Sequence, residues 1–75
     1  MAVILVVDDE IGIRELLSEI LSDEGYGVLL AENASAARSA MTQHPDLVLL
    51  DIWMPDNDGV SLLKEWNATG QLMFR

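Results

Sequence analysis

The sequence contains no cysteine, and only four of its 75 residues are basic. The absence of cysteine excludes a disulfide framework and fits a protein of a reducing compartment. The four cationic side chains are scattered along the chain, at Arg14, Arg38, Lys64 and Arg75. Because binding to a phosphate backbone requires a clustered basic surface, we expect no direct contact with nucleic acid.

Long hydrophobic runs and aromatic residues are also scarce. The apolar stretch at residues 1–7 has no basic residue before it and ends at two aspartates, so it is too short for a signal sequence or a membrane span. Hydrophobic residues make up 51% of the chain and aromatic ones only 5%, which predicts one small folded domain with an aliphatic core. We expect a soluble cytoplasmic protein.

Short apolar stretches alternate with amphipathic segments along the chain. Continuous apolar runs predict strands buried on both faces, as in a parallel sheet, and helical spacing of Leu and Ile predicts helices. The expected elements are a strand at 2–7, a helix from about Ile13 to Gly25, a strand at 28–31, a helix at 34–43 capped by Asn33 or Ser35, a strand at 47–50 and a helix from Val60 to about Asn67. This β-α-β-α-β-α order predicts an α/β fold with helices on the faces of a parallel sheet. Residues 71–75 look like the start of a fourth strand that does not develop.

Carboxylates follow two of the predicted strands. Asp8 and Asp9 end the first strand and Asp51 ends the third, within a chain whose formal net charge is −9. Ligands of parallel α/β sheets bind beyond the carboxyl ends of the strands, so the three side chains converge if these strands are neighbours, about 4.8 Å apart. Their mutual repulsion is costly unless a cation neutralises it, and oxygen ligands without cysteine or a second histidine favour Mg²⁺.

Each of these acidic residues also has a plainer interpretation. The segment 8–10 could simply cap the first helix, and Asp51 alone could be a turn residue. Asp56 and Asp58 are better explained by a turn and a helix cap than by a ligand role. The coincidence at two strand ends favours a site for Asp8, Asp9 and Asp51.

Two motifs resemble those of a known family. Val6-Val7-Asp8-Asp9-Glu10 follows the first strand, and Asp51-Ile52-Trp53-Met54-Pro55 follows the third, with Asp58-Gly59 opening the third helix. In this order and spacing, over essentially all 75 residues, the chain resembles the receiver domain of bacterial two-component response regulators, of the nitrogen-regulator type. The resemblance implies a three-layer, flavodoxin-like fold with strand order 2-1-3 in the part present.

The resemblance also implies roles for individual residues. Asp51 would accept a phosphoryl group from a sensor histidine kinase, and Asp8 and Asp9 would bind Mg²⁺ together with Asp51 and the backbone carbonyl of Trp53. A carboxylate nucleophile assisted by a divalent cation fits the chemistry of phosphoryl transfer. The side chain of Trp53 would either tune access of water at the pocket rim or anchor a partner at the surface.

The sequence departs from the family pattern after the third helix. The family sheet has five strands, and its later strands carry a hydroxyl residue and a lysine that bind the phosphoryl group. No residue of this chain matches either of them. Lys64 cannot replace the lysine, because it falls on the polar side of the third helix. Residues 1–75 are therefore expected to form an incomplete receiver domain. The third strand would then be an open sheet edge, which predicts a homodimer or higher oligomer joined at that edge or by tails around Leu72 to Phe74.

Two main hypotheses of function follow. The chain is either a Mg²⁺-dependent phosphoacceptor domain for two-component signal transduction or a non-catalytic receiver that binds a kinase or a second copy of itself. A truncated product without a function of its own is the weaker third possibility.

Overall fold

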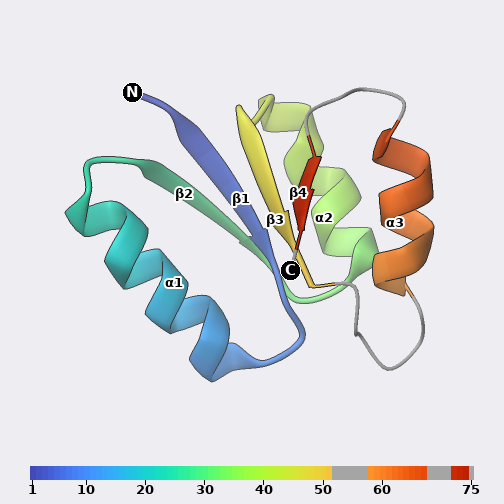
Figure 1. Ribbon diagram of the computed structural model, residues 1–75, viewed down its shortest axis with the longest axis horizontal. Coiled ribbons are helices and arrows are strands. Elements are labelled where there is room, and N and C mark those ends of the chain that lie inside the picture. Colours follow the sequence, from blue (N-terminus) through green and yellow to red (C-terminus); the bar gives the residue numbers. More distant parts are fainter. Residues whose placement is uncertain (52–57, 68–71, 75) are drawn as a thin grey trace.

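The computed structural model describes residues 1–51, 58–67 and 72–74 (Figure 1). Its elements are β1 (Val3–Val7), α1 (Ile11–Asp23), β2 (Gly27–Ala31), α2 (Ala34–Ala40), the 3-10 helix η1 (Met41–Gln43), β3 (Leu47–Leu50), α3 (Asp58–Asn67) and β4 (Leu72–Phe74). The alternation of strands and helices predicted from the hydrophobic pattern is therefore confirmed. No helix in the described ranges is long and apolar enough to cross a membrane.

The strands form a parallel sheet in the order β2-β1-β3-β4, with β1 between β2 and β3. Leu5 in the middle of β1 lies opposite Leu29 of β2 and Val48 of β3. The predicted order 2-1-3 and the flavodoxin-like arrangement are confirmed. Because β1 and β3 are direct neighbours, the residues that follow their carboxyl ends meet at the same edge of the sheet.

The C-terminal strand is the main difference from the sequence-based expectation. Residues 72–74 were predicted not to develop into a strand, but β4 pairs in parallel with β3, with Leu72 opposite Val48 and Phe74 opposite Leu50. The physical reason is that the backbone N–H and C=O groups along a buried strand require partners, and a three-residue apolar segment can supply them. The prediction that β3 is an open edge is wrong, and self-association through that edge loses its basis.

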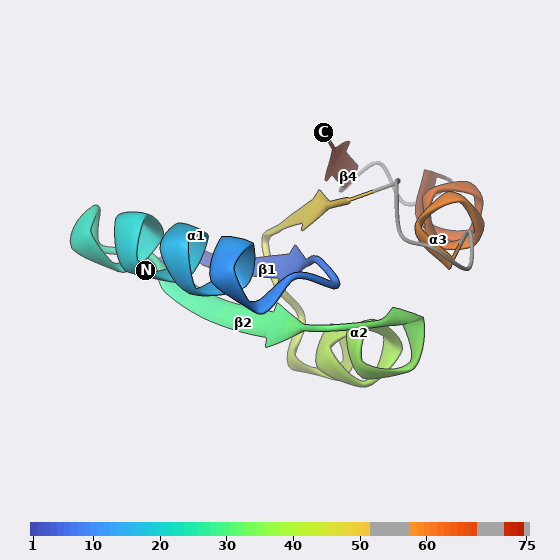
Figure 2. The ribbon, with the colours of Figure 1, turned by 90° about the horizontal axis from the view of Figure 1, so that it is seen from below.

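The helices lie on both faces of the sheet. Figure 2 shows α1 on one side, while α2 and α3 lie on the other. Side chains alternate along β1, so Leu5 and Val7 pack into the cluster formed with α2 and α3, whereas Ile4 and Val6 belong to the opposite face. The main cluster of buried side chains consists of Leu5, Val7, Ala31, Ala34, Ala37, Ala40, Val48, Leu50, Leu62 and Trp66.

The ends of the helices follow local chemistry. Asn33 caps α2, because its side-chain oxygen accepts a hydrogen bond from the N–H of Ala36 at 2.8 Å. The helix is shorter than predicted and continues as η1, which ends at His44 in a left-handed conformation with φ of 55°. Pro45 explains this ending, since the residue before a proline is disfavoured in the α-helical region. Gly25, with φ of 90°, follows the end of α1 as predicted.

Candidate metal centre

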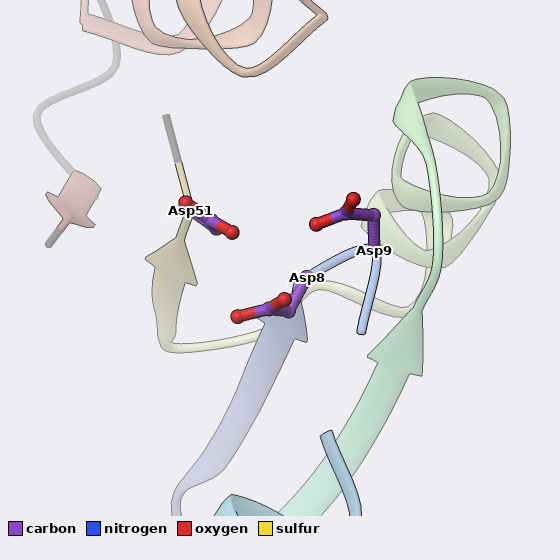
Figure 3. Close-up of side chains that lie close together, drawn as sticks. All are labelled: Asp8, Asp9 and Asp51. Carbon is purple, nitrogen blue, oxygen red and sulfur yellow. The ribbon is translucent and has the colours of Figure 1, made fainter. Parts of the chain in front are cut away.

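Three carboxylates lie together at the carboxyl end of the sheet. Asp8 and Asp9 follow β1 and Asp51 follows β3, and one ligand oxygen from each lies within 4.8 Å of the other two. Figure 3 shows the side chains of Asp9 and Asp51 pointing toward each other, with Asp8 at the end of its strand beside them. The convergence expected from the sequence is therefore present in the structure.

The sheet itself fixes the spacing of the two strand ends. The N–H of Asp51 donates to the carbonyl of Val7 at 2.9 Å, and the N–H of Asp8 donates to the carbonyl of Ala31 at 3.1 Å. These bonds continue the ladders of β3 with β1 and of β1 with β2 by one residue. The sheet therefore holds the backbone of both aspartates, and their side chains lie just beyond the carboxyl ends of β1 and β3.

Exposure differs strongly among the three acids. Asp8 is 1% exposed, Asp51 is half-buried and Asp9 is exposed. One carboxylate oxygen of Asp8 accepts a hydrogen bond from the N–H of Glu10 at 3.0 Å, and the backbone carbonyl of Asp8 accepts one from Nη1 of Arg14 at 2.7 Å. A buried carboxylate is costly without such partners, so these bonds help to retain Asp8 in its position.

The plainer interpretation of residues 8–10 as a helix cap accounts for only part of this arrangement. Glu10 is the N-cap residue of α1, and its side chain makes no capping hydrogen bond. The carboxylate of Asp8 bonds the N–H of Glu10 instead, which shapes the turn that leads into the helix. That bond uses one oxygen of Asp8 and does not explain why Asp9 and Asp51 lie beside it.

The donor set fits a small divalent cation. In an octahedral Mg²⁺ site with bonds of about 2.1 Å, adjacent ligand oxygens are about 3.0 Å apart and opposite ones about 4.2 Å apart. The three carboxylate oxygens lie within 4.8 Å of one another, about 0.6 Å beyond the wider of these separations, so small side-chain movements would bring them to an octahedral spacing. Three negative charges and oxygen-only donors favour Mg²⁺ over metals that prefer nitrogen or sulfur.

Several sequence-predicted residues lie elsewhere or outside the described ranges. Trp53 and Asp56 fall in residues 52–57, outside the described part, so the ligand role of the Trp53 carbonyl stays a prediction. Asp58 is the first residue of α3. His44 is exposed at the end of η1, and Lys64 is exposed on α3, in line with their predicted places at a helix end and on a polar helix side.

Arg14 was not predicted from the sequence to lie at this site. Its guanidinium bonds the residue that carries the most buried carboxylate of the site. A signal was available, since Arg14 is one of only four basic residues and lies six positions after Asp8. A long side chain in the first turn of a helix can bond the end of the strand before it. The spacing of the residues alone does not reveal whether it does so.

Comparison with known proteins places these features in a family. A family model described as the response regulator receiver domain matches residues 4–73. The chain is 48% identical over 62 residues to sporulation initiation phosphotransferase F of Bacillus subtilis, covering 81% of this chain and 50% of that protein. It is 41% identical over 68 residues to the transcriptional regulatory protein CpxR of Klebsiella pneumoniae, covering 91% of this chain and 29% of that protein. The chain thus spans half or less of the length of these two relatives.

Solved structures give the same result. The response regulator TrrA from Thermotoga maritima, solved in complex with Mg²⁺-BeF, matches with a TM-score of 0.84 and 42% identity over 99% of this chain and 66% of that one. The receiver domain of NtrX from Brucella abortus matches with a TM-score of 0.83 and 42% identity over 95% of this chain and 64% of that one. These identities and scores indicate a shared fold and a shared ancestry.

Proposed function

Starting from the fact that this chain belongs to the response regulator receiver domain family, we propose that Asp51 accepts a phosphoryl group from a sensor histidine kinase with the help of Mg²⁺. The observation that carries the proposal is the convergence of Asp8, Asp9 and Asp51 within 4.8 Å at the ends of two neighbouring strands. The proposal includes a cytoplasmic location for the protein. Self-association by way of the C-terminal tail stays a separate prediction.

Asp51 has the position that a nucleophile requires. It directly follows β3, its backbone N–H is bonded to Val7, and its side chain is half-buried. In the proposed step a carboxylate oxygen of Asp51 attacks phosphorus in line, the new O–P bond forms as the N–P bond of the phosphohistidine breaks, and the leaving imidazole nitrogen takes up a proton.

Asp8, Asp9 and Asp51 would hold the cation, with the Trp53 carbonyl as the further ligand implied by the family. When bound, Mg²⁺ would offset the negative charge of the carboxylates and of the incoming phosphoryl oxygens. TrrA, which is similar to this chain, was solved with Mg²⁺-BeF, and this supports the choice of metal. Asp51 is only half-buried, which leaves the proposed nucleophile approachable from solvent.

Mass spectrometry tests this proposal. Incubation of the protein with a small phosphodonor and Mg²⁺ should add one phosphoryl group, and Asp51→Asn should abolish the gain because the amide is not a nucleophile for phosphorus. Asp23→Asn is a matched control, since Asp23 is an exposed acid at the far end of α1. A gain that persists in Asp51→Asn would contradict the assignment of the nucleophile. Mg²⁺ binding without any gain in the wild type would favour the non-catalytic interaction module.

A further inference from the structure

Arg14 is the cationic side chain that bonds directly to the backbone of the acidic site. Its Nη1 atom donates a hydrogen bond of 2.7 Å to the carbonyl oxygen of Asp8, and its side chain is half-buried. Resting on the proposed function, we propose that Arg14 is a positioning residue for the cation pocket, which holds the carboxylates of Asp8 and Asp9 toward Asp51.

The bonded carbonyl belongs to the peptide unit that joins Asp8 to Asp9. Because a peptide unit is planar, fixing the direction of its carbonyl also fixes the direction of the N–H and Cα of the next residue. The hydrogen bond from Arg14 therefore constrains where the side chain of Asp9 begins. Asp9 is exposed, so little packing restricts its side chain, and the orientation of the backbone becomes correspondingly important.

The bond also closes a short loop. The chain leaves the sheet at Asp8 and enters α1 at Ile11, so only two residues lie between these points. The N–H of Arg14 donates to the carbonyl of Glu10 at 3.1 Å, which secures Arg14 in the first turn of the helix. From there its guanidinium reaches back to the strand end, while the N–H of Glu10 bonds the carboxylate of Asp8. Together these bonds tie the start of α1 to the end of β1.

Positioning and charge make opposite predictions for the loss of Arg14. A cation near a metal pocket repels the metal, so on electrostatic grounds alone Arg14→Ala should tighten the binding of Mg²⁺. If Arg14 instead holds the ligands in place, its loss should weaken binding, as removal of residues that orient metal ligands usually does. The sign of the change in affinity therefore separates the two roles.

The test is calorimetric titration of Mg²⁺ into four proteins, which are the wild type, Arg14→Ala, Arg14→Lys and Arg38→Ala. We expect the dissociation constant for Mg²⁺ to rise about tenfold in Arg14→Ala. This is the lower end of the range for the loss of a residue that orients metal ligands, because removing the Arg14 charge also removes its repulsion of Mg²⁺. Arg14→Lys keeps the charge but loses the planar guanidinium. Its dissociation constant should therefore lie between those of the wild type and Arg14→Ala, about threefold above the wild type. Arg38→Ala removes an arginine from an exposed ion pair with Glu65 on α2 and α3, and it should leave the constant within about twofold of the wild type.

A second measurement does not depend on the metal. Amide hydrogen exchange followed by NMR without Mg²⁺ should show faster exchange of the Glu10 N–H in Arg14→Ala, because the bond of this group to Asp8 requires the same loop geometry. Circular dichroism establishes that each variant is folded, and Arg14→Lys decides the question should Arg14→Ala unfold.

The outcomes distinguish this inference from the proposed function. A wild type that binds no Mg²⁺ would overturn both. Binding by the wild type that is unchanged or tighter in Arg14→Ala, with unchanged exchange at Glu10, would overturn the positioning role alone. If Arg14→Ala does not fold, an affinity for Mg²⁺ in Arg14→Lys equal to that of the wild type would also overturn the positioning role.

Discussion

On one face of the sheet, α2 and α3 cover a continuous cluster of buried side chains, whereas on the other face α1 contributes none that is fully buried. Leu62 of α3 is 0% exposed, but Leu16 and Ile20 of α1 are 53% and 49% exposed. The buried apolar area, and with it most of the hydrophobic free energy of folding, is therefore concentrated on the α2 and α3 face.

The acidic site joins these two regions. Asp51 follows β3, whose Val48 and Leu50 belong to the buried cluster, while Asp8 and Asp9 lead into α1. Since apolar packing holds α1 only partly, polar contacts such as the Arg14 bond to Asp8 gain importance on that side. The α2 and α3 face therefore supplies most of the stability, whereas two of the three candidate ligands, Asp8 and Asp9, lie at the less buried start of α1.

The largest expected effect comes from truncating matched leucines on the two faces. Leu62→Ala should lower the free energy of unfolding by about 2–5 kcal/mol, because it opens a cavity in the buried cluster. For a domain of this size such a loss is a large fraction of the total stability. Leu16→Ala, on an exposed part of α1, should cost less than about 1 kcal/mol. Urea unfolding followed by circular dichroism measures both, and equal losses would remove the contrast between the two faces.

Addition of Mg²⁺ should produce the next largest effect, because the cation would link the end of β3 to the loop before α1. At a free concentration one hundred times its dissociation constant, Mg²⁺ should stabilise the fold by about 2.7 kcal/mol, and a chelator should reverse the gain. Asp9→Asn should lose most of this stabilisation, whereas Asp23→Asn should keep it. A urea midpoint that is the same with Mg²⁺ and with chelator would contradict the metal site.

A smaller effect is expected from the N-caps of the two helices. Asn33→Ala removes the side-chain bond to the N–H of Ala36 at the start of α2 and should cost about 1 kcal/mol. Glu10→Ala, at the N-cap of α1, should change the free energy of unfolding by less than about 0.5 kcal/mol, because the side chain of Glu10 makes no capping bond. The same urea titrations measure both variants, and a larger loss in Glu10→Ala would reverse the proposed ranking.

Much of this arrangement could be predicted from the sequence for definite physical reasons. The continuous apolar runs that became β1 and β3 indicate strands buried on both faces, and parallel strands end at one edge. The residues that follow these strands, Asp8, Asp9 and Asp51, are therefore expected to lie together. Their convergence depends only on strand order, which the alternation of strands and helices restricts strongly.

The features that the sequence did not reveal depend on tertiary partners. The segment 72–74 is too short to indicate a strand by itself, and it forms β4 because β3 offers an edge to pair with. The bond from Arg14 to Asp8 depends on the direction in which α1 leaves the sheet. Neither the spacing of residues nor their composition determines that direction.

Mapping the phosphoryl group on the wild-type protein would show whether Asp51 is a Mg²⁺-dependent phosphoacceptor. The protein would be treated with a small phosphodonor in the presence of Mg²⁺ or of a chelator, and the modified peptide would be identified by mass spectrometry. We expect one phosphoryl group, located on Asp51 and formed only with Mg²⁺. A phosphoryl group on another residue, or equal labelling in the presence of chelator, would contradict this role of Asp51.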